Sequence, residues 1–331
     1  MWVRRENCSP LRWRCREPIR IAAGLGFNGA SILSRDGRKL FVIDGQYRAE
    51  LTRYDLRSRT FVPYLAGILA ADTDFSPDGK WVAYVRPPER MLWRSRLDGS
   101  NATQLTASGA EVYSPHWSPD GEHIAYMSIS AQKQYKACVV PAGGGQPRQL
   151  VPGAGEEGIP TWSRDGNFLV FGDTLHVQHA SEMAIHLVDL RNHQVSTLPG
   201  STGLWTPRWS PNGRYIATLA LGDESKGGLA ICLALLLYEF RTHTWTRLAN
   251  ADNILNLAWS RDSHYVYFDT GSADQGLYRV KIVSKKVEPV ASLKGFAGVG
   301  DGWIGVAPDG SPLMMKDTRI DEVYASDVQW P

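Results

Sequence analysis

FSPDGKWVAYV, at residues 75–85, is one of seven variants of a single phrase in this chain. The other six begin at Ser34, Trp117, Trp162, Trp209, Trp259 and Val306, and read SRDGRKLFVI, WSPDGEHIAYM, WSRDGNFLVF, WSPNGRYIATL, WSRDSHYVYF and VAPDGSPLMM. Successive copies lie 42 to 50 residues apart. A repeat with a period in the forties is typical of a β-propeller, in which each copy supplies one four-stranded sheet, or blade.

Each repeat is expected to be an antiparallel meander. In the copy at 75–85, Pro77 presets φ for a turn and Gly79 accepts a positive φ, so SPDG predicts a tight turn. A β-rich run follows at 81–85, and two further short strands are expected at 91–97 and 103–106. No helical periodicity is visible in the chain, and the sequence therefore predicts an all-β fold.

The strand count predicts how the propeller closes. Seven segments fit the third strand of a blade, the last being 322–328, but only six segments downstream fit the fourth. Residues 18–23 fit the missing fourth strand, and pairing them with the C-terminal blade would leave no open edge. The sequence thus predicts a seven-bladed β-propeller of four-stranded antiparallel blades, closed by strand 18–23, with six blades as the alternative. One propeller domain is expected over 18–331, after an irregular basic leader at 1–17.

The residues that recur in every copy are interpreted as scaffold. The repeated aromatic, for example Phe75 or Trp117, is expected to pack between blades, because a large ring buries about 150–250 Å². The aspartate of each motif is expected to form the turn by accepting backbone N–H groups.

Composition excludes several classes of function. The formal net charge is +2, which is too small to indicate nucleic-acid binding, and most of the basic excess lies in residues 1–20. The four cysteines form no CxxC pair with metal-ligand spacing, so buried thiols are expected. A GxGxxG match at 24–29 leads into a strand rather than a helix, which excludes a dinucleotide site.

Catalytic and metal motifs are equally weak. HVQH at 176–179 is interpreted as a solvated loop, because zinc would need more donors in a fixed geometry. HExxH, GxSxG and the P-loop are absent from the sequence. We therefore predict no cofactor, no metal and no enzymatic activity. The alternative is a propeller hydrolase or lyase that acts at the central channel.

The motif phrase, followed by a fourth strand of the RQL or QLT type, resembles the TolB-like, WD-repeat-like propellers of bacteria. The longer phrasing, such as LWRSRLDGSNATQLT at 92–106, resembles the C-terminal propellers of acidobacterial winged-helix regulators or Ser/Thr kinases. The resemblance implies a sensor or interaction module that binds a protein or peptide partner. A further alternative is the detached sensor domain of a transcriptional regulator or kinase.

The binding site is predicted on the loops opposite the SPDG turns, because functional residues favour such loops on rigid scaffolds. Acidic and aromatic groups gathered around a central pit suit a peptide, a protein or a cationic ligand. The predicted partner-binding residues are Arg86, Glu111, Tyr113, Glu156, Glu157, Asp173, His176, Trp205, Asp269 and Phe296.

The sequence also carries expectations about location and assembly. It shows no signal peptide, and its most apolar run, 229–237, is too short to span a bilayer as a helix. A soluble monomer is predicted for the chain as written. The periplasm is expected if the chain is a segment of a longer membrane-anchored protein.

Overall fold

The computed structural model describes residues 2–3, 19–20, 31–46, 49–65, 68, 70–153, 155–174, 183–222, 232–251, 253–271, 275–296, 303–318 and 320–327. Every regular element in these ranges is a β-strand, as the sequence predicts. The described part of the chain contains no helix long and apolar enough to cross a membrane. The chain divides into a larger compact unit, Ala49–Asp317, and a smaller one, Met1–Arg48 with Thr318–Pro331. These boundaries differ from the single domain predicted over 18–331.

The larger unit is built from four-stranded antiparallel sheets, which we call blades A to F. Blade A comprises β7 (Ala71–Phe75), β8 (Trp81–Arg86), β9 (Met91–Arg96) and β10 (Thr103–Gln104). Blade B comprises β11 (Ala110–Trp117), β12 (His123–Ser130), β13 (Tyr135–Pro141) and β14 (Arg148–Gln149). Blade C comprises β15 (Thr161–Trp162), β16 (Phe168–Gly172), β17 (Ile185–Asp189) and β18 (Gln194–Thr197). In each of these three blades, neighbouring strands in the sheet are consecutive along the chain.

Blades D to F complete the larger unit. Blade D comprises β19 (Leu204–Trp209), β20 (Tyr215–Leu221), β21 (Cys232–Glu239) and β22 (Thr244–Asn250). Blade E comprises β23 (Ile254–Trp259), β24 (Tyr265–Thr270), β25 (Gly276–Lys281) and β26 (Val287–Ser292). Blade F comprises β27 (Ile304–Val306), β28 (Pro312–Asp317), β5 (Ala49–Asp55) and β6 (Thr60–Pro63). The first strands contact one another in sequence order, β7, β11, β15, β19, β23 and β27, and β27 in turn contacts β7. The blades therefore form a closed ring with their first strands innermost.

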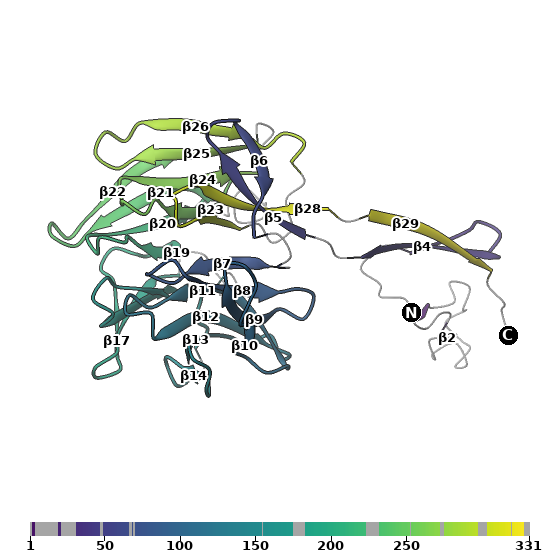
Figure 1. Ribbon diagram of the computed structural model, residues 1–331, viewed down its shortest axis with the longest axis horizontal. Helices are drawn as coiled ribbons and strands as arrows, with labels where there is room; N and C mark the ends of the chain where they lie inside the picture. The colour runs from purple at the N-terminus through teal and green to yellow at the C-terminus, as the bar shows by residue number, and fades with distance from the viewer. Residues whose placement is uncertain are drawn as a thin grey trace, which may run out of the picture. The chain divides into compact units, whose positions relative to one another are not determined.

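Blade F is the composite blade that joins the two ends of the propeller. In Figure 1, β5 lies beside β28, and the printed register pairs Leu313 with Arg53 and Asp317 with Ala49. Of the predicted closing segment 18–23, only Ile19–Arg20 (β2) is described, and it pairs with Trp2–Val3 (β1). A composite closing blade was thus predicted correctly, but the segment chosen to close it was wrong.

The smaller unit contains the first copy of the motif. Its three-stranded sheet has the order β29 (Ile320–Asp327), β4 (Lys39–Gln46), β3 (Ser31–Leu33). The seven copies therefore correspond to seven antiparallel sheets: six of four strands in the larger unit, which matches the alternative blade count, and this one of three strands.

Strand pairing assigns the first copy of the motif to the smaller unit. β4 pairs with β29 and β5 pairs with β28, so neither β4 with β5 nor β28 with β29 forms a hairpin. Only Tyr47-Arg48 and Thr318-Arg319 lie between these strands, and two-residue hairpin turns favour Gly, Asn or Asp. The sequence lacks the turn chemistry that a hairpin at either place needs.

The motif turn has the geometry that the sequence predicts. The Ser76 hydroxyl donates to Asp78 Oδ1 at 2.6 Å, and the Lys80 and Trp81 amides donate to Asp78 Oδ1 and Ser76 Oγ at 3.0 Å. Gly79 has φ +69°, which favours glycine. The serine–aspartate or serine–asparagine bond recurs in the pairs Ser34–Asp36, Ser118–Asp120, Ser163–Asp165, Ser210–Asn212 and Ser260–Asp262.

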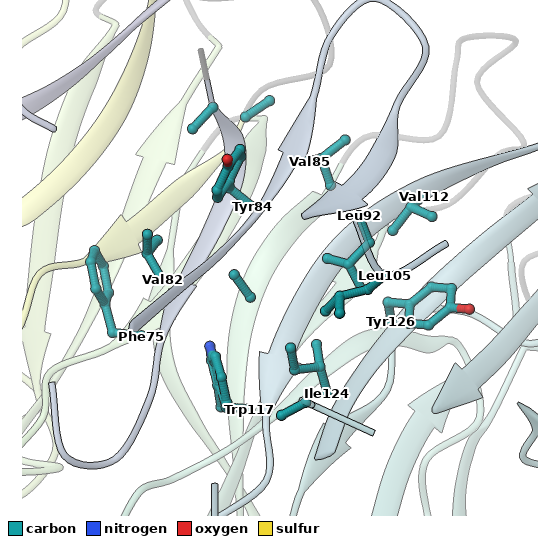
Figure 2. Close-up of a cluster of buried hydrophobic side chains, with 14 of the residues drawn as sticks. Phe75, Val82, Tyr84, Val85, Leu92, Leu105, Val112, Trp117, Ile124 and Tyr126 are labelled. Carbon is teal, nitrogen blue, oxygen red and sulfur yellow. The ribbon is translucent and has the colours of Figure 1, made fainter. Parts of the chain in front are cut away.

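The repeated aromatic joins neighbouring blades, as predicted. Figure 2 shows Phe75, Val82, Trp117 and Ile124 in the buried cluster shared by blades A and B. The indole N–H groups also donate across the blade interfaces, from Trp117 to the Asp74 carbonyl at 3.2 Å, from Trp162 to the His116 carbonyl at 3.0 Å, and from Trp259 to the Arg208 carbonyl at 2.9 Å. These bonds fix the backbone position of the residue that precedes the aromatic.

Candidate binding site

The larger unit contains a cavity of about 630 Å³. Residues of β7, β11, β15, β19, β23 and β27 line it, so the cavity is the central channel of the propeller. Its size lies within the range usual for ligand pockets, about 300–1,000 Å³.

Each blade places one residue at the channel wall, at the position just before its motif aromatic or valine. Since successive side chains of a strand point to opposite faces, this residue and the motif aromatic leave the strand on different sides. The aromatic packs between blades, and its ring also borders the channel. We call these six residues the inner ring: Asp74, His116, Thr161, Arg208, Ala258 and Gly305.

β-Bulges lie in several of the strands that carry the inner ring, on the N-terminal side of the inner-ring residue. The strand register shifts between Ala71 and Asp74, and equivalent shifts occur in β11, β19 and β23. Asp72, Ser114 and Thr206 each lie three residues before the motif aromatic and have φ of +45°, +45° and +50°. Bulges and strained residues of this kind re-aim side chains and cluster at functional sites.

Asp74 and His116 form a polar pair on neighbouring blades. His116 Nδ1 lies 3.8 Å from Asp74 Oδ2, which accepts the Trp117 amide at 2.7 Å. Burial raises the pKa of Asp74 to about 6, and burial together with the charge of Arg208 lowers the pKa of His116 to about 3. At neutral pH Asp74 is therefore a carboxylate and His116 is neutral. Among the described residues, no hydrogen-bond partner meets His116 Nε2.

Arg208 faces the same channel from blade D. Burial lowers its pKa to about 10, while the charge of Asp72 acts in the opposite direction. The guanidinium thus stays cationic at neutral pH. Its Nη1 donates to the Pro207 carbonyl at 3.1 Å.

A second charged network lies on blades A and B. Arg90 Nη2 is 3.0 Å from Asp72 Oδ2, and its guanidinium lies 3.7 Å from the ring centroid of Tyr113. The Tyr113 hydroxyl donates to Glu111 Oε2 at 2.7 Å, and Asp72 also accepts the Ser114 amide at 3.2 Å. This network neutralises Asp72 and fixes Tyr113 at the channel wall.

The structure brings two of the predicted binding residues into the channel. Tyr113 and Trp205 line the cavity, and Glu111 contacts Tyr113. The Trp205 indole donates to Cys232 Sγ at 3.1 Å, which orients its ring. The binding role of these residues stays a prediction.

The other predicted residues have partners within the fold. Glu157 is buried against Lys136, and Asp173 Oδ1 lies 3.1 Å from His186 Nε2. Glu156 accepts the Thr174 hydroxyl, Asp269 accepts the Asn256 amide, Phe296 packs on Phe61, and Arg86 lies over Trp93. His176, together with the HVQH stretch, lies outside the described residues. The described residues contain no group of three or more metal-ligating side chains suited to a metal ion.

Sequence reasoning missed the inner ring, although a signal for it was visible. The position before the motif aromatic or valine reads Asp, His, Thr, Arg, Ala and Gly in blades A to F. The phrase that follows is nearly constant, so this variation is what an asymmetric site on a symmetric scaffold should show.

The buried carboxyl group of Asp269 predicts that the stability of the fold depends on pH. Asp269 is 4% exposed, burial raises its pKa to about 6, and it accepts the Asn256 amide at 2.8 Å. Because the native state binds this proton more tightly than the unfolded state, the group destabilises the fold as pH rises from about 4 through 6. Asp269→Asn mimics the protonated form, so we expect it to raise the free energy of unfolding at pH 8 by about 2–3 kcal/mol.

Urea unfolding at pH 4 and pH 8 measures this effect, and the gain should disappear at pH 4. Asp78→Asn is the matched control. The Ser76 hydroxyl lowers the pKa of the exposed Asp78 carboxyl, so that substitution should remove stability at pH 8 instead. A gain at Asp269 that is equal at both pH values would show that its charge is not the cause.

Comparison with known proteins agrees with the architecture. Residues 87–218 match the model of the TolB β-propeller domain. This stretch of the chain is similar to a TolB β-propeller domain. Among curated relatives, protein Atu1656 of Agrobacterium fabrum is 30% identical over 106 residues, which cover 28% of this chain and 36% of the relative. The Tol-Pal system protein TolB of Chromobacterium violaceum is 43% identical over 54 residues, 16% of this chain and 13% of that protein. The matched stretches thus span about a third or less of these relatives.

Solved structures extend the likeness over most of the chain. A TolB assigned in Agrobacterium tumefaciens superposes with a TM-score of 0.64 at 19% identity, covering 82% of this chain and 99% of that one. TolB from Acinetobacter baumannii gives 0.55 at 16% identity, with 87% and 82% covered. An oligogalacturonate lyase in complex with manganese gives 0.51 at 13% identity, with 87% and 79% covered. At these identities the likeness shows the shared fold.

Proposed function

We propose that this chain is a non-enzymatic propeller that binds a protein or peptide partner, part of which enters the central channel. The observation that carries the proposal is the channel itself, a cavity of about 630 Å³ lined by every blade of the larger unit. Its wall is rich in aromatic rings and holds charges of both signs. Aromatic residues and arginine are the residue types enriched in protein interfaces and among the residues that dominate their binding energy.

The TolB likeness supports a protein partner. The relatives named as Tol-Pal system proteins belong, by that name, to a multi-protein system. Their matched stretches are short, so the identity of the partner does not transfer from them. What transfers is the suitability of this fold as a binding scaffold.

A channel-plugging variant tests the proposal. Peptides selected for binding to the purified chain should lose affinity for Ala258→Phe, which adds bulk to the inner ring, and for Leu255→Trp, which adds it to an exposed channel-lining position. Val283→Phe is the matched control, because Val283 is 88% exposed and outside the channel lining. Thermal melting checks that each variant folds. Selected peptides that bind all three variants equally well would place binding elsewhere and sink the proposal.

One observation favours an enzyme as the second candidate. At the wall of the channel, burial raises the pKa of Asp74 to about 6, and perturbed pKa values of this kind are shared by catalytic acids and bases. A hydrolase or lyase acting at the channel would use this carboxyl as its proton carrier. Turnover of a peptide or sugar substrate that Asp74→Asn abolishes, with binding retained, would support this candidate over the first.

A further inference from the structure

Three arginines gather on one side of the central channel. Arg208 belongs to the inner ring of blade D, while Arg164 and Arg261 replace the motif proline in blades C and E. Blades C, D and E are consecutive in the ring. We call these three residues the basic wall.

The basic wall lacks carboxylate partners within the described structure. Other arginines, such as Arg53, Arg90 and Arg279, lie within 3.0 Å of an aspartate or glutamate oxygen. Among the residues that the structure describes, no aspartate or glutamate lies within ion-pair distance of any basic-wall guanidinium. Arg208 uses one N–H for the Pro207 carbonyl, and a guanidinium has five.

The opposite wall offsets this charge only in part, because the charge of Asp72 raises the pKa of Arg208 and Arg261 acts to lower the pKa of Asp74. Blade A, three positions from blade D around the ring, supplies Asp72 and Asp74. Asp72 is paired with Arg90, and His116 on blade B is neutral because its pKa is lowered. Asp74 therefore remains as one negative charge against three guanidinium groups.

We propose that the basic wall recognises carboxylate groups, so that the segment entering the channel is an acidic peptide. A guanidinium fork matches a carboxylate bidentately, and such charge-assisted bonds are the strong ones. A largely desolvated cation with no carboxylate at hydrogen-bond distance is costly, so an anionic ligand would stabilise Arg208 most of all. This inference rests on the proposed function and adds the chemistry of the partner.

The spacing of the basic wall favours an extended chain over a single compact anion. Arg208 precedes the motif aromatic of its blade by one residue, whereas Arg164 and Arg261 follow theirs by two. Arg208 lies within β19, whereas Arg164 and Arg261 lie in the turns that follow β15 and β23, so the three side chains begin at two levels along the channel. Carboxylates spaced along a peptide can meet both levels, and one phosphate meets only one.

The channel provides its own reporter for the test. Six of the 12 tryptophans of the chain line the cavity: Trp117, Trp162, Trp205, Trp209, Trp259 and Trp303. Intrinsic fluorescence of the full chain is titrated with capped Glu-Leu-Glu-Leu-Glu, and with the same peptide carrying Gln or Lys in place of Glu. Inorganic phosphate and acetate are titrated in parallel.

The glutamate peptide should bind at least tenfold more tightly than its glutamine analogue, and more tightly still at low salt. Arg208→Gln should weaken binding about tenfold or more, and the exposed Arg164→Gln and Arg261→Gln a few-fold each. Arg214→Gln is the control on blade D, because Arg214 pairs with Glu239 and does not line the channel. Melting temperatures report folding, and the two exposed variants keep the test open if Arg208→Gln unfolds.

Each remaining outcome separates the inference from the function on which it rests. Equal binding of the glutamate and glutamine peptides, or tighter binding of the lysine peptide, would overturn the carboxylate inference and leave a peptide-binding channel. Saturable binding of phosphate alone would overturn the acidic-peptide inference in favour of a small anion. If no peptide changes the tryptophan fluorescence, and the plugging variants Ala258→Phe and Leu255→Trp do not weaken the binding of selected peptides, both the carboxylate inference and the proposed function would be overturned.

Discussion

Lys136→Met is expected to lower the free energy of unfolding by about 3–5 kcal/mol, because it leaves a buried carboxylate without its counter-ion. The Lys136 side chain is 11% exposed and that of Glu157 is 4% exposed, and Nζ lies 3.1 Å from Glu157 Oε1. The ammonium also donates to the Gly153 and Gly155 carbonyls, and Glu157 Oε2 accepts the Ala137 amide at 3.0 Å. The cluster holds the loop between blades B and C against β13.

The pKa of Glu157 shows how costly the unpaired carboxylate would be. Burial already raises this pKa even though Lys136 and the Ala137 amide act to lower it. Without the ammonium the carboxyl must take up a proton or remain as an uncompensated charge. The loss of stability in Lys136→Met should therefore shrink as the pH falls, because protonation removes the charge.

A double-mutant cycle isolates the pair. Lys136→Met with Glu157→Gln removes both charges, so the double variant should recover a large part of the stability that Lys136→Met loses. Lys80→Met is the control, because Lys80 pairs with Asp78 at 3.7 Å on the surface and such pairs contribute about 0–1 kcal/mol. Chemical denaturation at pH 7 gives the free energy of unfolding of the unsubstituted chain, of Lys136→Met, of Glu157→Gln and of the double variant. Additive losses would show that the two side chains do not act as a pair.

This cluster also changes how variants of predicted binding residues are to be interpreted. Glu157 was predicted to bind a partner from an exposed loop, but its carboxylate is enclosed by Lys136 and Ala137. A Glu157 substitution that reduces binding could act through the fold of the loop. Trp205 and Tyr113, which line the channel, are the predicted residues that test binding most directly.

The features that depend on local sequence could be predicted, because one turn or strand carries the whole signal. Ser76, Asp78 and Gly79 form the predicted turn through contacts within five residues of one another. The blade interfaces followed from the repeated aromatic, and Trp117 and Trp259 pack and hydrogen-bond between blades. These local rules fix the blade but not the number of blades.

Ring closure depended on a choice between distant partners. Residues 18–23 and 61–65 both fit the pattern of a fourth strand, and the pattern alone does not say which of them belongs to the blade of the last copy. The structure pairs β28 with β5, so the chain crosses from β4 to β5 without a hairpin. The two-residue linkers at 47–48 and 318–319 contain no Gly, Asn or Asp, and this composition indicates that neither linker forms a tight hairpin turn.

The channel residues were missed because their roles arise from the symmetry of the ring. Asp74, His116 and Arg208 are far apart in sequence and meet only because each precedes the motif aromatic of its own blade. Nothing in one copy shows that its predecessor residue faces those of the other blades. Alignment of the copies by the aromatic would have shown the charged positions together.

Leu313→Ala is expected to destabilise the propeller by about 2–5 kcal/mol, because it opens a cavity in the blade that closes the ring. Leu313 on β28 is fully buried, and Leu51 on the neighbouring β5 is 2% exposed. The Thr52 hydroxyl donates to the Met314 carbonyl at 2.8 Å between the same two strands. Leu51→Ala should cost a similar amount, although Leu51 lies near the other end of the chain.

Leu56→Ala is the matched control for both variants, because Leu56 follows β5 but is 61% exposed, and its loss should cost no more than about 0.5 kcal/mol. Urea unfolding measures the three variants. Because the closed ring links blade F to blades A and E, the two buried substitutions should shift one common transition of the larger unit. If Leu51→Ala proves as mild as Leu56→Ala while Leu313→Ala is severe, β5 does not complete the blade, and another strand must close the ring.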